Sequence, residues 1–325
     1  MKLVLKALGI LLALLVVVAL GVYVWAGMTT DRVRAQTFET HSVDFPIPFP
    51  LDPQEIASLG LTDEAARQLA QERAVARGKH LVEARYPCVA CHSATFGGGV
   101  MVDAFPIGHL LAPNLTLGTG SRTANFTPRD WDRIVRHGVL SNGRPAVMPS
   151  EDFQSMSDQE LSDIVSYIRT MPPVNNTVAA STFGPLGKIL VATGQIKLSA
   201  SVIKTHNSPH AVRAPAEASA EFGRHLAAVC SGCHGSDFSG GPIQGGDPSW
   251  PPARNLTPDA TGLGGWTYDQ FVTAVARSQR PDGTALRPPM TFIAPYGQNM
   301  TDVERHALWS FLQSLPPVSK KIAEK

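Results

Sequence analysis

All four cysteines of this 325-residue chain lie in two copies of one short motif. The stretches YPCVACH and VCSGCH each place two cysteines three positions apart, with a histidine directly after the second one. Any fold of this chain must therefore accommodate two equivalent groups. These are Cys88, Cys91 and His92 in the first copy and Cys230, Cys233 and His234 in the second.

Three kinds of chemistry use such cysteine pairs: disulfides, a shared zinc site and covalently attached haem. Zinc bound by the four cysteines would be tetrahedral, but it would leave both histidines without a role. A thioredoxin-like redox pair explains neither the histidine nor the duplication. The C-x-x-C-H sequence is the attachment signal for c-type haem, in which both thiols form thioethers and the histidine binds iron. The motifs therefore predict two covalently attached haem c groups.

An uncharged apolar run follows Lys2 and Lys6 and extends from Ala7 to Gly27. At about 1.5 Å per residue, a helix of this length covers the roughly 30 Å hydrocarbon core of a bilayer. Lysines on the short N-terminal side favour a cytoplasmic N-terminus. We expect residues 1–28 to be a single-pass anchor in the lipid of the cytoplasmic membrane, with the rest of the chain on the periplasmic side.

A cleaved signal peptide is the alternative, because Val24, Trp25 and Ala26 form a passable cleavage site. The apolar run is longer than the usual core of a signal peptide, which favours a retained anchor. Both interpretations export the chain, as haem attachment outside the cytoplasm requires.

The chain also contains an internal repeat. Aligning the two C-x-x-C-H motifs also aligns Asn-Leu-Thr at 114–116 with Asn-Leu-Thr at 255–257. Residues 156–174 pair without gaps with residues 300–318, and each of these segments starts with a capping box and ends at Pro-Pro. We expect two homologous modules. The predicted divisions are a proline-rich extracytoplasmic linker at 29–65, module one at 66–175, a second linker at 176–215 and module two at 216–320.

The modules are predicted to be all-α, because strand signals are weak throughout. Each should have a helix before the haem motif, a middle helix near 127–137 or 267–277, and a closing helix. Gly78 and Gly223 are expected to let the first helix cross the last one closely. The first linker should be extended and hold module one above the membrane. The second is too apolar for a free tether and should pack against a module or the bilayer.

The pattern resembles the class I cytochrome c family, in particular the membrane-anchored dihaem members related to the cytochrome subunits of periplasmic alcohol and sugar dehydrogenases. The resemblance rests on the two haem motifs, on APNLT and ARNLT, on TGLGGWTYDQFVTAV, on RPDGTALRPPM and on the two P-P-V helix ends. It implies two tandem class I cytochrome c domains behind one transmembrane helix. Many of those subunits have three haem motifs, whereas this chain has two.

Two methionines are the predicted sixth ligands of the irons. Met148 and Met290 each lie 56 residues after the histidine of their motif, in loops stiffened by adjacent prolines. The predicted axial pairs are His92 with Met148 and His234 with Met290. The alternative is a methionine that only fills the haem pocket. Saturated His-Met ligation raises the potential of the iron and suits electron transfer.

The remaining histidines carry weaker expectations. His80 and His225 recur at equivalent positions on the helix before each motif, where a surface or propionate-side contact is expected. His109 and His137 are alternative distal ligands in module one. The other four show no metal-ligand spacing: His41, His206, His210 and His306.

The predicted function is a dihaem electron carrier, or the electron-transfer subunit of an oxidoreductase complex, rather than a catalyst. Its expected redox partners are a dehydrogenase, a quinol-oxidising complex, a soluble cytochrome or a terminal oxidase. A net charge of +1 with 17% charged residues does not indicate nucleic-acid binding. The alternative is a dihaem cytochrome c peroxidase with one open haem site. A haem-based sensor would need a cytoplasmic output segment.

Overall fold

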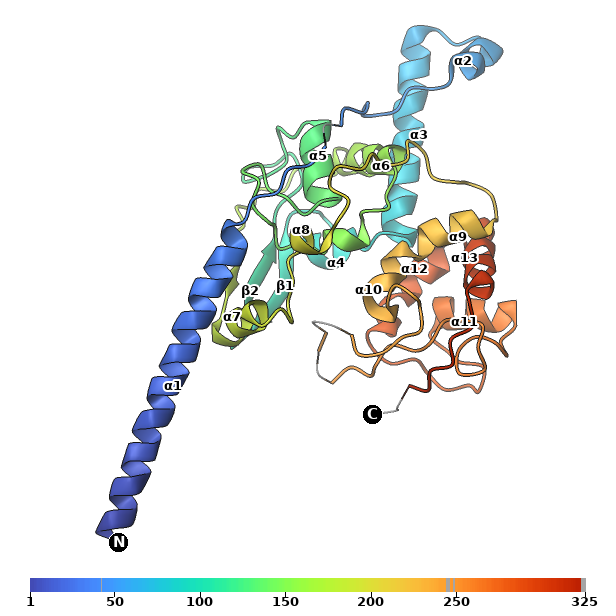
Figure 1. Ribbon diagram of the computed structural model, residues 1–325. Helices are drawn as coiled ribbons and strands as arrows, with labels where there is room; N and C mark the ends of the chain where they lie inside the picture. Colours follow the sequence, from blue (N-terminus) through green and yellow to red (C-terminus); the bar gives the residue numbers. More distant parts are fainter. Residues whose placement is uncertain (42, 244–245, 248, 323–325) are drawn as a thin grey trace.

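The computed structural model describes residues 1–41, 43–243, 246–247 and 249–322. One long helix, α1 (Lys2–Ala35), projects from a body made of two helical domains that lie side by side (Figure 1). We call the part that holds α3 to α6 domain 1 and the part that holds α9 to α13 domain 2. Each domain contains one C-x-x-C-H motif.

Domain 1 is built around the long helix α3, whose N-cap is Thr62 and which carries the chain directly to the first haem motif. A capping box at Thr127 starts its middle helix, and the predicted one at Ser157 starts its closing helix. The elements are α3 (Asp63–Ala84), α4 (Cys88–His92), α5 (Pro128–Val135), the 3₁₀ turn η1 (Ser150–Asp152) and α6 (Asp158–Ile168).

Domain 2 repeats this plan with shorter helices before its haem motif. Capping boxes at Thr267 and Thr301 start its middle and closing helices. The elements are α9 (Ala220–Ala227), η2 (Ala228–Cys230), α10 (Ser231–His234), α11 (Tyr268–Arg277), η3 (Met290–Phe292), α12 (Ala294–Asn299) and α13 (Asp302–Ser314).

The predicted glycine crossings are confirmed in both domains. A β-carbon on Gly78 would overlap the carbonyl oxygen of Asp163 on α6 and lie 2.9 Å from Cβ of Tyr167. One on Gly223 would overlap the carbonyl oxygen of Ala307 and lie 2.6 Å from Cβ of Phe311. The first and last helices of each domain therefore touch through their backbones, which only glycine permits.

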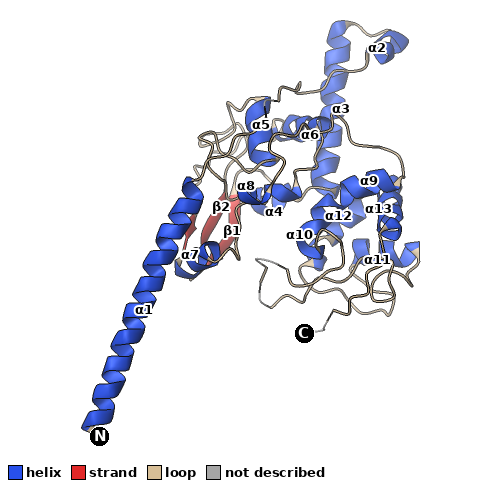
Figure 2. Ribbon diagram, in the orientation of Figure 1, coloured by secondary structure: helices blue, strands red, loops and turns tan. Residues whose placement is uncertain are grey.

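The all-α prediction is wrong in one place, because a small sheet lies beside domain 1 (Figure 2). It is antiparallel in the order β1 (Gly99–Ala104), β2 (Gly108–Ala112) and β3 (Thr182–Phe183). Leu110 and Phe183 are buried in a small cluster with Val191 and Leu198. The sheet is stabilised by the pairing of β2 with β3 and by burial against the second linker. Strand propensity within each short segment does not include such contacts.

The second linker packs against domain 1 and α1, in line with its apolar composition. Its helices are α7 (Pro185–Ala192) and α8 (Ser199–Val202). The hydroxyl of Thr30 on α1 donates to the carbonyl of Lys188 on α7, and the Lys188 ammonium lies 5.3 Å from the centroid of the Tyr23 ring. Ser199 and Ala200 of α8 are buried. This linker is therefore part of the folded body.

The first linker packs closely on domain 1, which the prediction of an extended segment that holds module one above the membrane did not include. It is extended after α1, but Phe45 is only 4% exposed and packs into the core of domain 1. The hydroxyl of Ser162 on α6 donates to the carbonyl of Pro46. The linker ends in a short helix, α2 (Pro53–Leu59). Bulky residues between the prolines pack against domain 1 because burying them is more favourable than exposing them to water.

Among the described residues, α1 is the one helix that is long and apolar enough to cross a membrane. Its apolar side chains are exposed along most of its length, whereas Ala26 and Thr30 near its C-terminal end are buried. The helix is continuous past Gly27 and ends at Ala35.

Candidate functional site

The first C-x-x-C-H motif forms α4, and the second covers the last residue of η2 and all of α10. None of the four cysteines forms a disulfide. Within the described part of the chain they do not converge on a common metal site. Burial raises the pKa of Cys88 and of Cys230 to about 12, so both are neutral thiols before haem attachment. These observations disfavour the disulfide and shared-zinc alternatives.

The motif histidines are buried and held in one orientation. Nδ1 of His92 lies 2.9 Å from the carbonyl oxygen of Pro113, and Nδ1 of His234 lies 2.7 Å from that of Arg254. A carbonyl only accepts, so Nδ1 carries the proton and Nε2 keeps its lone pair. Burial lowers the pKa of both rings, partly opposed by these bonds. Each histidine therefore presents the nitrogen that an axial ligand uses, with its tautomer set by the second bond.

The loops that hold the histidines are closed by the repeated Asn-Leu-Thr and Pro-Pro-Val segments. The side-chain amide of Asn114 donates to the carbonyl of Val174, and that of Asn255 donates to the carbonyl of Val318. Each asparagine directly follows the carbonyl that accepts from the motif histidine. The motifs that define the repeat in the sequence thus form one bonded unit in each domain.

The two predicted methionine ligands differ in how they pack against the core of their domain. Met148 packs against the same core cluster as Cys88 and lies just before η1. Met290 is partly buried like Met148, but it starts η3 and lies outside the core cluster that contacts Cys230. Prolines flank both, Pro149 after the first and Pro289 before the second.

The two domains meet through a symmetric pair of ionic contacts. Nε2 of His80 in domain 1 lies 2.9 Å from a carboxylate oxygen of Glu304 in domain 2. Nε2 of His225 in domain 2 lies 2.9 Å from a carboxylate oxygen of Glu160 in domain 1. The Arg85 guanidinium hydrogen-bonds both glutamates. Both carboxylates are almost fully buried, so these contacts join the domains away from water.

These contacts correct the expectation for His80 and His225, which lie at the interface between the domains rather than on a free surface. The glutamates are the third residues of the capping boxes of α6 and α13. The sequence indicated that these glutamates cap helices, but it did not indicate that they also pair with histidines of the other domain. The available signal was that both the histidine and the glutamate recur at matching positions of the repeat.

Each haem motif is also contacted by the other domain. A β-carbon on Gly232, inside the second motif, would lie 2.6 Å from Oδ1 of Asp152 in domain 1. Helix α12 packs on α3, and the side-chain amide of Asn299 at its end donates to the carbonyl of Glu83 near the end of α3. The segment that follows each predicted methionine therefore packs against the other domain at or near its haem motif.

The other histidines fall into three places. His109 forms an ion pair with Asp103 on the sheet, and His306 stacks on Tyr268 on an exposed face of domain 2. His137 is fully buried, with its two ring nitrogens facing His206 and His210. His41 joins this last group, although its spacing along the chain does not indicate such proximity.

Comparison with known protein families matches each of the two domains to a family model. The family model described as cytochrome c oxidase, cbb3-type, subunit III matches residues 73–168, and the cytochrome c model matches residues 220–316. Both modules are cytochrome c domains. The chain therefore carries two domains of the cytochrome c family, and its two motifs attach two haem c groups. The Cys88 and Cys91 pair and the Cys230 and Cys233 pair fit this attachment.

Relatives among curated proteins are cytochrome subunits of dehydrogenases. The alcohol dehydrogenase (quinone) cytochrome c subunit of Gluconacetobacter polyoxogenes is 28% identical over 255 residues, which cover 71% of this chain and 54% of the relative. The corresponding subunit of Gluconobacter oxydans is 24% identical, with 78% and 57% covered. The fructose dehydrogenase cytochrome subunit of Gluconobacter japonicus is 23% identical, with 76% and 54% covered. The chain spans about half the length of these relatives.

Proposed function

We propose that this cytochrome is an electron carrier in which two haems, one per domain, pass single electrons along one chain. The observation that carries the proposal is the mutual contact of the domains at or near their haem motifs, through Asp152 beside Gly232 and through α12, which packs on α3 and bonds the carbonyl of Glu83. Electron transfer needs cofactors held at a short and constant separation. The buried His80–Glu304 and His225–Glu160 pairs hold the domains in such an arrangement.

The residues of the chain then have distinct roles. We assign His92 and His234 as the proximal ligands, because the carbonyls of Pro113 and Arg254 hold each Nδ1–H and leave Nε2 free. We assign Met148 and Met290 as the distal ligands on their equal spacing and proline-bounded loops. Haem iron so ligated supplies one-electron chemistry between its ferric and ferrous states. Buried walls such as Phe96 and Phe238 exclude water from the two cores.

Helix α1 serves in this proposal as a retained membrane anchor with both haem domains on the periplasmic side. Its exposed apolar surface needs a lipid environment, and Lys2 and Lys6 stay at the cytoplasmic interface. The contacts of Thr30 and Tyr23 with Lys188 fix domain 1 close to the end of the helix. Cleavage after Ala26 would remove Tyr23 and with it the contact of that ring with Lys188.

The relatives point to a dehydrogenase as the partner that supplies electrons. Since this chain spans about half of their length, we extend to it only the class of partner and not a substrate. The relatives give no support to the peroxidase alternative, which would require one displaceable distal ligand.

The test uses the full-length protein in mild detergent, purified with both haems. We expect a redox titration to show two one-electron steps and the fully reduced protein to bind almost no carbon monoxide near neutral pH. A mild-detergent extract should retain a dehydrogenase bound to it, and membranes should retain the protein after a high-salt wash.

Two results would contradict the proposal. One is stoichiometric carbon monoxide binding at one haem together with fast peroxide reduction, which would identify a peroxidase. The other, which concerns the anchor alone, is a mature N-terminus near Gly27.

A further inference from the structure

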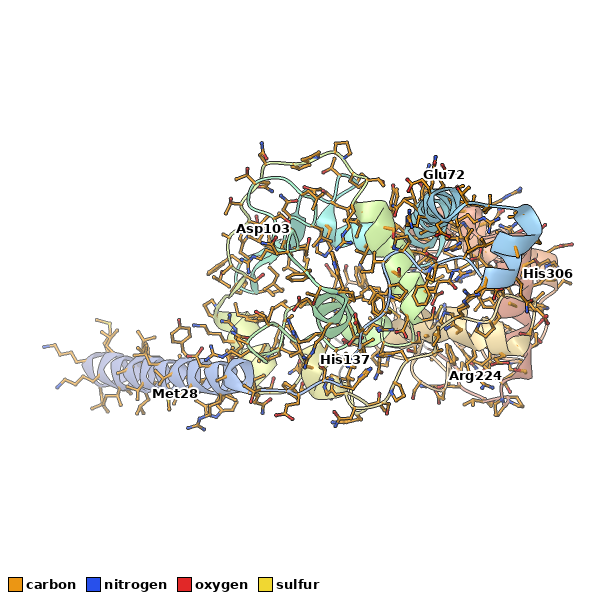
Figure 3. All side chains as sticks on the ribbon, turned by 90° about the horizontal axis from the view of Figure 1, so that it is seen from above. Met28, Glu72, Asp103, His137, Arg224 and His306 are labelled. Atoms are coloured by element: carbon orange, nitrogen blue, oxygen red, sulfur yellow. The ribbon has the colours of Figure 1, made fainter. Side chains whose placement is uncertain are left out.

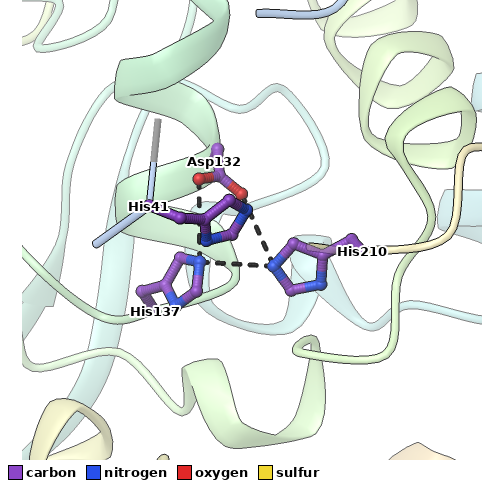
Figure 4. A group of neighbouring side chains, drawn as sticks. All are labelled: His41, Asp132, His137 and His210. Carbon is purple, nitrogen blue, oxygen red and sulfur yellow. Dashed lines mark hydrogen bonds and ion pairs between the residues drawn. The ribbon is translucent and has the colours of Figure 1, made fainter. Parts of the chain in front are cut away.

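A second group of chemically active side chains lies in domain 1, apart from the haem motifs. His41, Asp132, His137 and His210 each offer one ligand atom, and these atoms all lie within 4.8 Å of one another (Figure 4). His137 and Asp132 are fully buried. The four residues come from the first linker, from α5, from the turn after α5 and from the second linker. No role in haem attachment accounts for this convergence.

Hydrogen bonds fix the tautomers of two of the rings. Nδ1 of His41 lies 2.9 Å from the carbonyl oxygen of His206 and must donate to it, which leaves a lone pair on Nε2. That Nε2 atom is buried and has no hydrogen-bond partner. Nε2 of His206 donates to the carbonyl of Ala200, so its Nδ1 accepts from Nδ1 of His137 at 3.1 Å. The lone pair of His137 is therefore also on Nε2.

The third ring faces the same point. Nε2 of His210 lies 3.2 Å from Nε2 of His137, while the other nitrogen of His210 points away from the group (Figure 4). The backbone of Gln154 also forms a hydrogen bond with the His210 ring.

The carboxylate completes the set. Oδ1 of Asp132 accepts from Nε of Arg136 at 2.7 Å, which orients the group, and Oδ2 is buried without a hydrogen-bond partner. Oδ2 lies 3.6 Å from Nε2 of His137, and Oδ1 lies 3.7 Å from Nε2 of His210. A tetrahedral ion with bonds of about 2.0–2.1 Å separates its ligands by about 3.4 Å. The 3.2 Å between the Nε2 atoms of His137 and His210 and the 3.6 Å from Nε2 of His137 to Oδ2 lie within a few tenths of an ångström of that value.

Charge also favours a cation. Arg136 is fully buried and pairs with both Asp132 and Asp158, so these three groups carry a formal charge of −1. A divalent ion has the opposite sign. A surface pocket of about 230 Å³ is lined by His210 together with Gln154 and Thr205, which offers an entry path from solvent.

Domain 2 provides an internal comparison. Its middle helix α11 aligns with α5 from their capping boxes, which places Val272 where domain 1 has Asp132 and Arg277 where domain 1 has His137. A cytochrome c domain of this kind therefore folds without the group. The group belongs to the part of domain 1 to which both linkers attach.

We propose that His41, Asp132, His137 and His210 bind one divalent transition-metal ion of the zinc class. Three neutral imidazoles and one carboxylate are ligands that Zn²⁺ prefers, and four ligands suit a structural site. Bound there, the ion ties the segment after the membrane helix and the segment before domain 2 to the body of domain 1. This proposal does not depend on the electron-transfer function.

The first experiment measures metal content. The full-length, haem-loaded protein in mild detergent is dialysed against zinc, washed with a weak chelator and analysed for zinc and iron. We expect one zinc and two irons per chain. His41→Ala and His210→Ala should keep two irons but lower zinc affinity more than about tenfold, a loss seen even for residues that only support ligands. His306→Ala, in domain 2 and far from His137 in Figure 3, should keep the zinc.

The second experiment uses only the wild-type protein and so does not depend on whether the variants fold. Chelation should speed proteolysis within residues 193–215, and added zinc but not magnesium should restore protection. The proposal is overturned if the wild-type protein takes up no zinc and zinc does not change its proteolysis. It is also overturned if well-folded His41→Ala and His210→Ala variants bind zinc as tightly as the His306→Ala control.

Discussion

Domains 1 and 2 share the parts that a haem requires and differ in what surrounds them. In both, a histidine donates Nδ1–H to the carbonyl before an Asn-Leu-Thr segment, and the asparagine holds the Pro-Pro-Val end of the closing helix. In both, a glycine lets the first and last helices touch. In the part of the chain that the structure describes, two linkers wrap domain 1 and α1 packs beside it.

The difference in linker packing is visible in the residues of the two middle helices, α5 and α11. Asp132, Arg136 and His137 are fully buried in domain 1, whereas domain 2 has Val272, Ala276 and Arg277 at the matching positions. The haem-binding unit is thus preserved while the face of α5 is adapted to hold the linkers. Contacts found in both domains therefore serve haem binding. Contacts found in domain 1 alone serve to hold the linkers against it.

The largest expected effect separates the two haem sites. Replacing Cys230 and Cys233 by alanine should remove one haem and leave the other, because each motif attaches its own group. Replacing Cys88 and Cys91 should do the same for domain 1. Denaturation followed by measurement of covalently bound haem and iron checks this, with one haem per chain expected in each variant. A single cysteine pair that controls both haems would show that the domains do not mature separately.

The next effect tests whether the two distal sites are equivalent. Met148→Ala should open one haem to carbon monoxide and Met290→Ala the other, and each should lower the potential of its own haem by removing the thioether. Titration of the reduced variants with carbon monoxide should give one molecule bound per chain, with Met101→Ala as a control. A variant that binds none would reject methionine ligation in that domain.

The helix crossings should respond alike in the two domains. Gly78→Ala and Gly223→Ala each place a methyl group against a backbone carbonyl, so we expect each to lower the free energy of unfolding by about 1–3 kcal/mol. Gly265→Ala, where a β-carbon meets no atom within 4 Å, is the matched control. Denaturant unfolding of the haem-loaded variants measures the loss. An unchanged stability in one variant would mean that its helices can separate without cost.

The smallest expected effect concerns the contacts between the domains. Burial alone would raise the pKa of Glu304, but the hydrogen bond from His80 and the charge of Arg85 lower it to about 2. A lowered pKa means that the stabilisation is complete above about pH 4.5 and is lost as the pH falls toward 2. Glu304→Gln should therefore destabilise the protein by about 2 kcal/mol at pH 7 and by much less near pH 2.

Unfolding at several pH values checks this prediction, with Glu72→Gln on the exposed face of α3 as the control (Figure 3). An equal destabilisation by Glu304→Gln at pH 7 and near pH 2 would show that the charge of Glu304 does not stabilise the interface.

Most of the haem-binding unit could be predicted from the sequence because its signals are local or repeated. The C-x-x-C-H motifs, the capping boxes at Ser157 and Thr301, and the glycines opposite Tyr167 and Phe311 each depend on one helix or on matching positions of the repeat. Repetition made even the glycine crossing visible, since chance would not place it twice.

The sheet, the contacts between the domains and the histidine group could not be predicted in the same way. Strand β3 pairs with β2 from about 70 residues further along the chain. His80 and Glu304 are 224 positions apart. His41 and His210 approach α5 from two different linkers. No spacing rule joins residues on separate segments.

The sequence by itself determined how many haems the chain attaches, which residues attach them and which helices enclose them, because covalent motifs and helix caps act within a few residues. The tertiary structure decided how the two domains face each other and where the linkers pack. Those choices depend on burying side chains from distant segments together, and the free energy of that burial exists only once the chain has folded.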